Sequence, residues 1–285
     1  MIVVLFIHSS LFLENLRYKE LVKEIKLNYH EILNLDKFVN LKKLICVYYK
    51  DFINFPDLSK LVKLKFLNCS HNDLDKLTGL SECIKLKYLY VNNNKLTELY
   101  NLSKLNNLIY LDCSNNQLTK LPDLSKCINL EYLYCFNNQL TELPDLSKCI
   151  KLKYLYCYNN KLTKLPDLSK CIDLEKIYCS NNNLTDLSIL CKLNNLYIVS
   201  CFNNKLIKLP KLFNNKLMIF TFYNNKFSKL PLNITKYKYL KKYTKYNYYK
   251  NTHTHILNEL LCYKIKYYYY LNIMNYYQKY NILTK

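Results

Sequence analysis

Glycine and arginine are almost missing from this chain of 285 residues, in which Gly79 and Arg17 are single occurrences. Loops that cradle phosphates and dinucleotide-binding fingerprints need several glycines, because the backbone must approach the ligand closely. The usual nucleotide-binding enzymes are therefore excluded. Hydrophobic residues make up 50% of the chain, which is enough for one sizeable core or two small domains. The abundance of Lys, Asn, Tyr and Ile is typical of a genome rich in A and T.

Long apolar runs are also missing. No stretch reaches the roughly 20 apolar residues that a transmembrane helix needs, so we expect a soluble protein. The opening "MIVVLFIHSSLFL" has no basic residues before its apolar run, is interrupted by His8, and is followed by no small-residue cleavage site. These features favour an N-terminal strand or helix that covers the end of a core, while a targeting segment remains the alternative.

Positive charge dominates, with a net charge of +21. Residues 236–285 contain ten lysines and a single acid, Glu259, and so contribute +9. A balance of this kind favours acidic partners and says little about the fold.

A nearly identical segment of 22 residues recurs along the chain. "LEYLYCFNNQLTELPDLSKCIK", residues 130–151, is followed by "LKYLYCYNNKLTKLPDLSKCID". The spacing is 22 residues except for one interval of 23 and one of 21, and a shorter, degenerate unit starts at Val22. The nine clear units begin at Leu41, Leu64, Leu86, Leu108, Leu130, Leu152, Leu174, Leu196 and Leu217.

Two periods are mixed within each unit, whose residues we number 1 to 22. Apolar residues occupy positions 1, 4, 6, 11, 14, 17 and 20. Alternation over positions 3 to 7 predicts a strand, and the later spacing of three predicts an extended or 3₁₀ return. One unit alone cannot offset the entropy of ordering its backbone, so the units must stack.

The pattern LxxLxCxxNxLxxL resembles leucine-rich repeats of the 22-residue class, over about residues 22–235. The resemblance implies an α/β solenoid with a parallel β-sheet on its concave face and short 3₁₀ or irregular segments on its convex face. We expect an N-terminal cap at 1–21, about ten repeats at 22–235, and a basic Tyr/Lys-rich cap or tail at 236–285. The bias toward Asn, Lys and Tyr is also similar to leucine-rich repeat proteins of large DNA viruses with AT-rich genomes.

Asparagine recurs at positions 8 and 9, as in Asn137 and Asn138. The resemblance implies that the position 9 amides form a buried ladder, since an amide both donates and accepts hydrogen bonds. The position 8 residue is expected to adopt backbone angles for which other proteins use glycine.

Thirteen cysteines fall mainly at core positions 6 and 20. Neighbouring parallel strands lie about 4.8 Å apart, beyond the roughly 3.8 Å between Cβ atoms that a disulfide prefers, and no CxxC pair suggests a metal. We predict that cysteine serves as a small apolar filler. No cofactor or metal is expected, and free thiols favour a reducing compartment such as the cytoplasm.

Aromatic residues crowd strand positions 3, 5 and 7. By the family resemblance these side chains line the concave face, where tyrosine and phenylalanine would bind a protein partner. The alternative is that the aromatic ladders only stabilise the sheet. The candidate partner-binding residues are Phe66, Tyr88, Tyr90, Tyr110, Tyr132, Tyr134, Phe136, Tyr154, Tyr156, Tyr158, Tyr178 and Phe202.

The sequence shows no recognisable set of catalytic residues. The five histidines are scattered, and the only close pair is His253 and His255. We therefore do not expect an enzyme. Residues 236–285 are interpreted as a capping helix, a binder of nucleic acid or an anionic membrane, or drifted low-complexity sequence.

The sequence favours a protein-interaction scaffold over a binder of polyanions such as nucleic acid or an anionic membrane. Salt distinguishes the two, since polyanion binding weakens steeply with ionic strength. The oligomeric state is not evident from the sequence.

Overall fold

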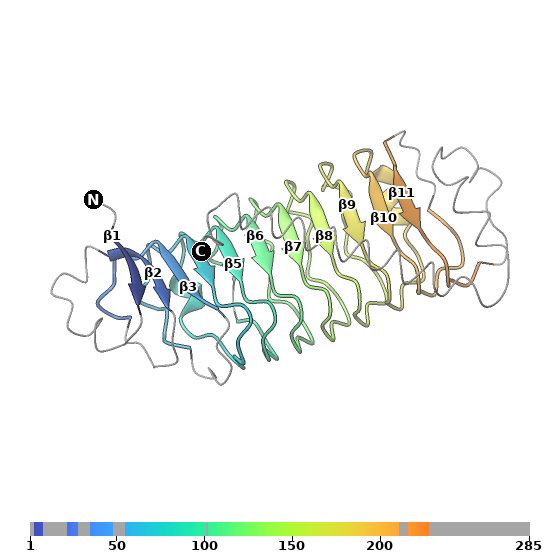
Figure 1. Ribbon diagram of the computed structural model, residues 1–285. Helices are drawn as coiled ribbons and strands as arrows, with labels where there is room; N and C mark the ends of the chain where they lie inside the picture. Colours follow the sequence, from blue (N-terminus) through green and yellow to red (C-terminus); the bar gives the residue numbers. More distant parts are fainter. Residues whose placement is uncertain are drawn as a thin grey trace. The chain divides into compact units, whose positions relative to one another are not determined.

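A sheet of parallel strands runs through the computed structural model (Figure 1). The structure describes residues 3–7, 22–27, 35–47, 55–100, 102–210 and 216–227. Within these ranges a single sheet of eleven strands runs in chain order. The strands are β1 (Val3–Ile7), β2 (Val22–Leu27), β3 (Lys43–Cys46), β4 (Phe66–Asn68), β5 (Tyr88–Tyr90), β6 (Tyr110–Asp112), β7 (Tyr132–Tyr134), β8 (Tyr154–Tyr156), β9 (Lys176–Tyr178), β10 (Ile198–Ser200) and β11 (Ile219–Thr221).

The register of the sheet matches equivalent repeat positions. Tyr110 pairs with Tyr132, which pairs with Tyr154, and each step is one repeat of 22 residues. The predicted stacking of identical coils is therefore confirmed. At the N-terminal end, β1 pairs in parallel with β2, with a register shift between Val3 and Val4. A strand thus forms in the segment for which the sequence left strand or helix open.

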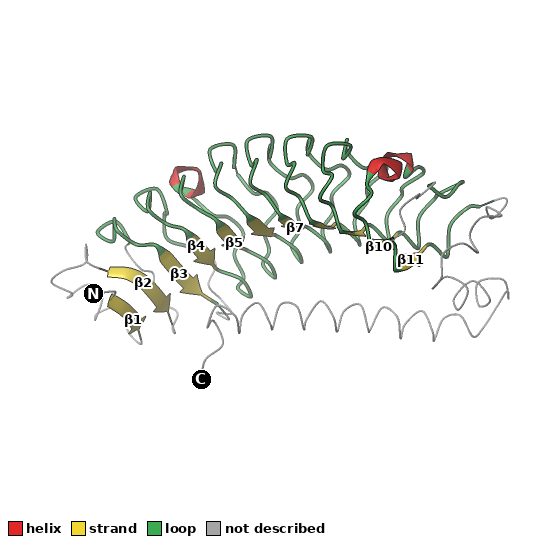
Figure 2. Ribbon diagram, turned by 90° about the horizontal axis from the view of Figure 1, so that it is seen from above, coloured by secondary structure: helices red, strands yellow, loops and turns green. Residues whose placement is uncertain are grey.

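The core lies between the sheet and the return segments. In the coil that starts at Leu152, six of the seven predicted apolar positions are completely buried, and only Leu165 is half-buried. Equivalent positions are also buried in the neighbouring coils, so the core is continuous along the stack. Figure 2 shows the strands on the inner side of the stacked coils and the loops on the other side.

The return segments are mostly turns. Two short 3₁₀ helices occur in the described part of the chain, η2 (Leu80–Glu82) and η3 (Ser188–Lys192). Both lie in coils without proline, whereas the coils that contain Pro122, Pro144 and Pro166 have turns instead. The coil that starts at Leu86 also lacks proline, yet its described return residues form turns. The predicted 3₁₀ returns therefore form in only some coils, and proline alone does not decide which.

The hydrogen-bonding ladder and the positive φ predicted for asparagine are both confirmed, although Asn138, Asn160 and Asn225 are half-buried rather than buried. Asn138 donates from Nδ2 to the carbonyl oxygens of Cys113 at 3.0 Å and Cys135 at 3.1 Å, and its Oδ1 accepts from the Leu118 N–H at 3.0 Å. The same pattern recurs at position 9 from coil to coil. The position 8 residues adopt positive φ of 49–56° from Asn93 to Asn224, and His71 takes this place in an earlier coil with φ of 58°.

Gly79 precedes η2 with φ of 74°. A Cβ atom here would lie 2.2 Å from both Asp57 Oδ1 and the backbone nitrogen of Ser59. Glycine is therefore required by backbone angle and by close approach of the preceding coil.

The cysteines form two buried rows, one at position 6 and one at position 20. All twelve described cysteines are free thiols, and eleven are buried. In the position 20 row, Cys127 Sγ donates to the Leu102 carbonyl at 3.8 Å and Cys149 Sγ to the Leu124 carbonyl at 3.6 Å. Burial raises the pKa of the Cys149 thiol to about 12 and that of Cys171 to about 11.

These thiols are expected to react with a maleimide near pH 8 at different rates. A buried thiol with a raised pKa supplies almost no thiolate, whereas Cys191 is half-buried. Among the twelve described cysteines, Cys191 should react first, with Cys113 and Cys149 at least tenfold slower. Peptide mass spectrometry after timed quenching measures this order. Equal labelling of Cys149 and Cys191 would contradict the buried row.

Several sequence interpretations lie outside the described residues. These are the tail at 236–285 with His253 and His255, and the cap at 1–21 apart from β1. Among the described residues, no helix combines the length and apolar character that a membrane crossing requires.

Candidate interaction surface

The side chains at positions 3, 5 and 7 share the face of the sheet opposite the leucine core. This follows from strand alternation, because the completely buried Leu133 and Cys135 point to the core and their neighbours point away. We call this face the aromatic face. All twelve candidate residues of the sequence analysis lie on it.

Position 5 forms the central row of the aromatic face. Tyr134 and Tyr156 have ring centroids 4.6 Å apart, and Tyr156 and Tyr178 approach to 4.4 Å in an edge-to-face contact. Tyr90 contacts Tyr110 of the next strand at 4.6 Å. Contacts at these separations are favourable beyond simple burial of area, so the rings support one another across the sheet.

Two rows flank the centre. At position 7, Phe136 and Tyr158 stack with centroids 4.4 Å apart and an interplanar angle of 8°. At position 3, Tyr132 and Tyr154 meet edge to face at 5.1 Å. The register of the sheet places these rings side by side.

The aromatic face is less exposed than the sequence suggested. Eight of the twelve candidates are only 2–9% exposed, and Tyr88, Tyr132, Tyr154 and Tyr158 are half-buried. Alternation predicts the face on which a side chain lies, but the mutual packing of the rings contributes to how much of each is accessible. The buried candidates are Phe66, Tyr90, Tyr110, Tyr134, Phe136, Tyr156, Tyr178 and Phe202.

Burial also governs ionisation of the phenols. It raises the pKa of Tyr178 to about 12, and it raises the pKa of Tyr134, with the carboxylate of Asp112 adding to the shift. These tyrosines are therefore neutral near pH 7. A neutral phenol can donate a hydrogen bond but supplies no base for catalysis.

Polar residues interrupt the central row at Asn68 and Asp112. The Asp112 carboxylate accepts from the Ser114 N–H at 3.1 Å and from the Ser114 hydroxyl at 2.6 Å. Asn68 makes the equivalent contacts with Ser70 at 3.0 and 2.7 Å. The recurring pair of Asn or Asp at position 5 with Ser at position 7 is a sequence signal that marks these two coils.

Charged groups border the aromatic rows. Lys176 Nζ lies 4.3 Å from the Tyr154 ring centroid and 5.3 Å from that of Tyr197, within cation–π range. Lys153 donates to Glu131 at 2.8 Å, and this contact raises the pKa of Lys153. Lys176 occupies position 3, where each of the strands from β4 to β8 has tyrosine or phenylalanine.

Metal ligands are not assembled on this surface. Within the described ranges, no group of three or more His, Cys, Asp or Glu side chains is arranged to hold a metal ion. The aromatic face offers mostly neutral ring surface, with the Asp112 side chain in its central row and Lys176 at its border. Such a surface is suited to recognition by contact.

A family model described as leucine rich repeats (2 copies) matches residues 84–126 and 128–170. These matches fall on coils whose strands pair at equivalent positions. The chain is a leucine-rich repeat protein. Comparison with curated protein sequences gives no significant match.

Solved leucine-rich repeat structures resemble this leucine-rich repeat protein over most of the described coils. The functional domain of InlJ from Listeria monocytogenes, described as including a cysteine ladder, is 27% identical with a TM-score of 0.57, over 74% of this chain and 50% of that chain. YopM, a leucine-rich effector protein from Yersinia pestis, is 33% identical with a TM-score of 0.54, over 67% and 52%. A TDR receptor is 29% identical with a TM-score of 0.63, over 73% and 40%. The chain thus spans about half the length of these proteins or less.

Proposed function

We propose that this leucine-rich repeat protein is a non-catalytic binding module whose aromatic face docks a protein partner. The observation that carries the proposal is the set of aromatic rows held in register by the sheet, with Tyr132, Tyr154 and Tyr158 accessible at their flanks. Rings already fixed by their neighbours lose little conformational entropy on binding. A protein described as a receptor and one described as an effector share the fold.

The half-buried rings at position 3 provide the cleanest test. Threonine replaces Tyr132 and Tyr154 in one double variant, because threonine favours strands and removes the ring. The partner is first isolated by affinity purification with the full chain, and its Kd is then measured by calorimetry. We expect the double variant to weaken binding by about tenfold to 100-fold, as for central aromatic contacts at interfaces.

The matched control is Tyr100→Thr. Tyr100 is 51% exposed and lies outside the strands, so its loss should leave the Kd unchanged. An unchanged Kd for the Tyr132 and Tyr154 variant, with its unfolding midpoint also unchanged, would refute the aromatic face as the docking site. Binding through this face should depend only weakly on salt, in contrast to binding of a polyanion.

A further inference from the structure

The loops that precede the strands carry a second row of exposed side chains, outside the aromatic face. At position 21 or its equivalent, these loops expose an aliphatic side chain in six coils. We call this row the aliphatic stripe. It contains six of the ten exposed large hydrophobic residues in the described ranges, with exposed fractions of 42–61%: Val39, Val62, Ile84, Ile128, Ile150 and Ile172.

Lysines lie on both sides of the stripe in the sequence. Position 19 and its equivalent in the earlier coils carry most of them. Position 22 carries lysine in four coils and asparagine in four others, and the acids at the two positions are Glu82 and Asp173. Eleven exposed lysines thus accompany the stripe: Lys37, Lys60, Lys63, Lys85, Lys104, Lys126, Lys148, Lys151, Lys170, Lys192 and Lys216.

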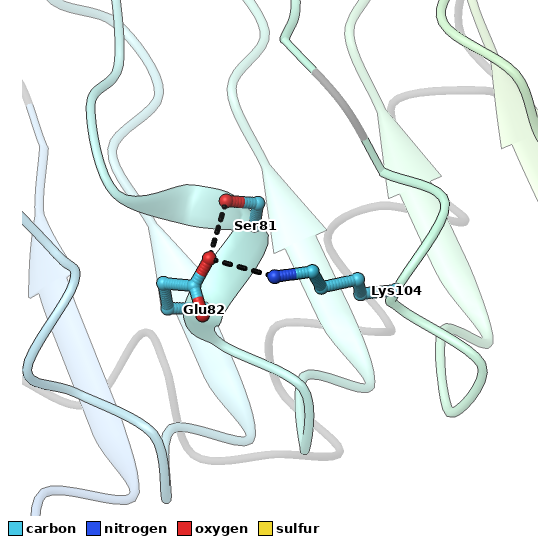
Figure 3. A network of polar contacts seen from close by, with 3 residues as sticks. All are labelled: Ser81, Glu82 and Lys104. Carbon is cyan, nitrogen blue, oxygen red and sulfur yellow. Dashed lines mark hydrogen bonds and ion pairs between the residues drawn. The ribbon is translucent and has the colours of Figure 1, made fainter.

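Ion pairs neutralise little of this charge. Glu82 lies between the hydroxyl of Ser81 and Lys104 Nζ, each 3.0 Å from its Oε1 (Figure 3). Elsewhere in the lysine rows, no carboxylate of the described residues lies within ion-pair distance of Lys126, Lys148 or Lys170.

Carboxylates do occur on the neighbouring turns, three residues before some of these lysines. Asp145 accepts from the Ser147 N–H at 2.8 Å, and Asp167 accepts from the Ser169 N–H at 2.9 Å. Their main contacts are thus with the turn. The lysine rows keep an excess of positive charge, because their eleven lysines outnumber the acids in the rows and on these turns.

At position 13 of the repeat, by contrast, side chains of like charge do not follow one another in neighbouring coils. Position 13 alternates in sign from coil to coil, in the order Lys76, Glu98, Lys120, Glu142, Lys164, Asp186, Lys208. Position 19 instead repeats lysine in five consecutive coils, from Lys104 to Lys192. Like charges on neighbouring elements are destabilising, and codon bias acts on both rows equally. Position 19 thus concentrates charge of one sign on this surface, whereas position 13 does not.

Side-chain amides brace the loops that carry the stripe. Asn107 Nδ2 donates to the Ile84 carbonyl and Asn195 Nδ2 to the Ile172 carbonyl, both at 3.0 Å. Where Asn106 replaces the aliphatic residue, the surface has a hollow lined by Ile84, Ser103, Lys104, Asn106, Asn107 and Lys126. The row is thus presented by a fixed backbone.

We propose that the aliphatic stripe, together with its lysine rows, docks the solenoid on an anionic phospholipid bilayer. Exposed aliphatic side chains enter the boundary between headgroups and acyl chains, while lysines contact the anionic headgroups through flexible stems. The choice of lipid over nucleic acid follows from the side chains between the lysines, since single-stranded nucleic acid is held by aromatic stacking and this row is aliphatic. The surface differs from the one proposed to bind protein, so either proposal can fail without the other.

Vesicle flotation of the full chain tests the proposal. The probes are phosphatidylcholine vesicles, alone and with about 30 mol% phosphatidylserine. We expect binding to the anionic vesicles only, weakened by high salt. Absence of binding to the anionic vesicles would overturn the proposal, as would binding of polyglutamate or a single-stranded oligonucleotide without binding of vesicles.

The stripe is tested by the triple variant Ile128→Asn, Ile150→Asn, Ile172→Asn. Asparagine occupies the same position naturally at Asn106 and Asn194, so the fold should tolerate it, which the unfolding midpoint checks. We expect partitioning to anionic vesicles to fall at least about tenfold. The control Ile207→Asn removes an equally exposed isoleucine from another row and should leave partitioning unchanged.

Two matched sets of lysine variants distinguish the effect of the lysine rows on vesicle binding from the effect of the overall net charge. Lys126→Gln, Lys148→Gln, Lys170→Gln should lower partitioning on the order of 100-fold. Lys120→Gln, Lys164→Gln, Lys208→Gln removes the same net charge from position 13 and should have a much smaller effect. Equal effects of the two triples, or none from the first, would overturn the proposal, because cations elsewhere in the chain would then hold the vesicle.

Discussion

Replacing Tyr134 and Tyr156 together by alanine is expected to lower the free energy of unfolding by about 5 kcal/mol. Both rings are less than 10% exposed, and their centroids lie 4.6 Å apart. Each truncation removes buried apolar area and leaves a cavity, and the pair also loses the ring contact itself. Because the two residues touch, their individual effects will not simply add. Urea unfolding followed by circular dichroism measures the change.

Tyr100→Ala is the control for this double variant. The Tyr100 side chain is 51% exposed, so its removal should change the free energy of unfolding by about 0.5 kcal/mol at most. If the double alanine variant unfolds at the same urea concentration as the parent chain, the ring contacts do not stabilise the sheet. The expected destabilisation is also the reason for probing partner binding at Tyr132 and Tyr154 instead.

Replacing Asn138 by leucine is expected to cost about 3 kcal/mol of unfolding free energy. The amide donates to three backbone carbonyls and accepts from the Leu118 N–H. Leucine is similar in size but forms none of these hydrogen bonds, so backbone groups of two adjacent coils remain unsatisfied in a largely buried turn. The midpoint of urea unfolding should fall, with little change in the slope if the native coils are retained.

Gln139→Leu makes the comparison at the next residue. Gln139 is exposed, and its replacement should alter the free energy of unfolding by about 0.5 kcal/mol or less. Equal free energies of unfolding for the Asn138 and Gln139 variants would show that the hydrogen bonds of Asn138 do not stabilise the fold.

The repeat itself was predictable because its physics is periodic. Alternation over positions 3 to 7 locates the strand, although from β4 to β11 the strand itself covers only positions 3 to 5. The identity of position 9 marks the amide that the turn requires, so Asn138 could be assigned its role from sequence. The positive φ of Asn137 followed from the shortage of glycine, since asparagine is the usual substitute in that region. Each of these inferences concerns a residue and its equivalents one coil away.

Other features depend on how much neighbouring side chains cover one another. The face on which Tyr134 lies was predictable, but its low exposure depends on packing in three dimensions. The aliphatic stripe has a sequence signal that was missed, because Ile128, Ile150 and Ile172 recur at position 21, outside the seven core positions. In a chain so rich in isoleucine, that recurrence did not stand out. The half-buried Cys191 departs from the two cysteine rows because it stands at position 18, within η3, while Leu193 fills the buried position 20 of its coil.

The asparagine ladder gives the stack a direction. Asn138 accepts from Leu118 and donates to Cys113, both in the coil before it, and Asn225 does the same for Leu206 and Cys201. Each turn is therefore completed by the coil that follows it in the chain. A ribosome makes the N-terminal coils first, so every newly emerged coil closes its predecessor, and the order of synthesis coincides with the order in which the turns are satisfied.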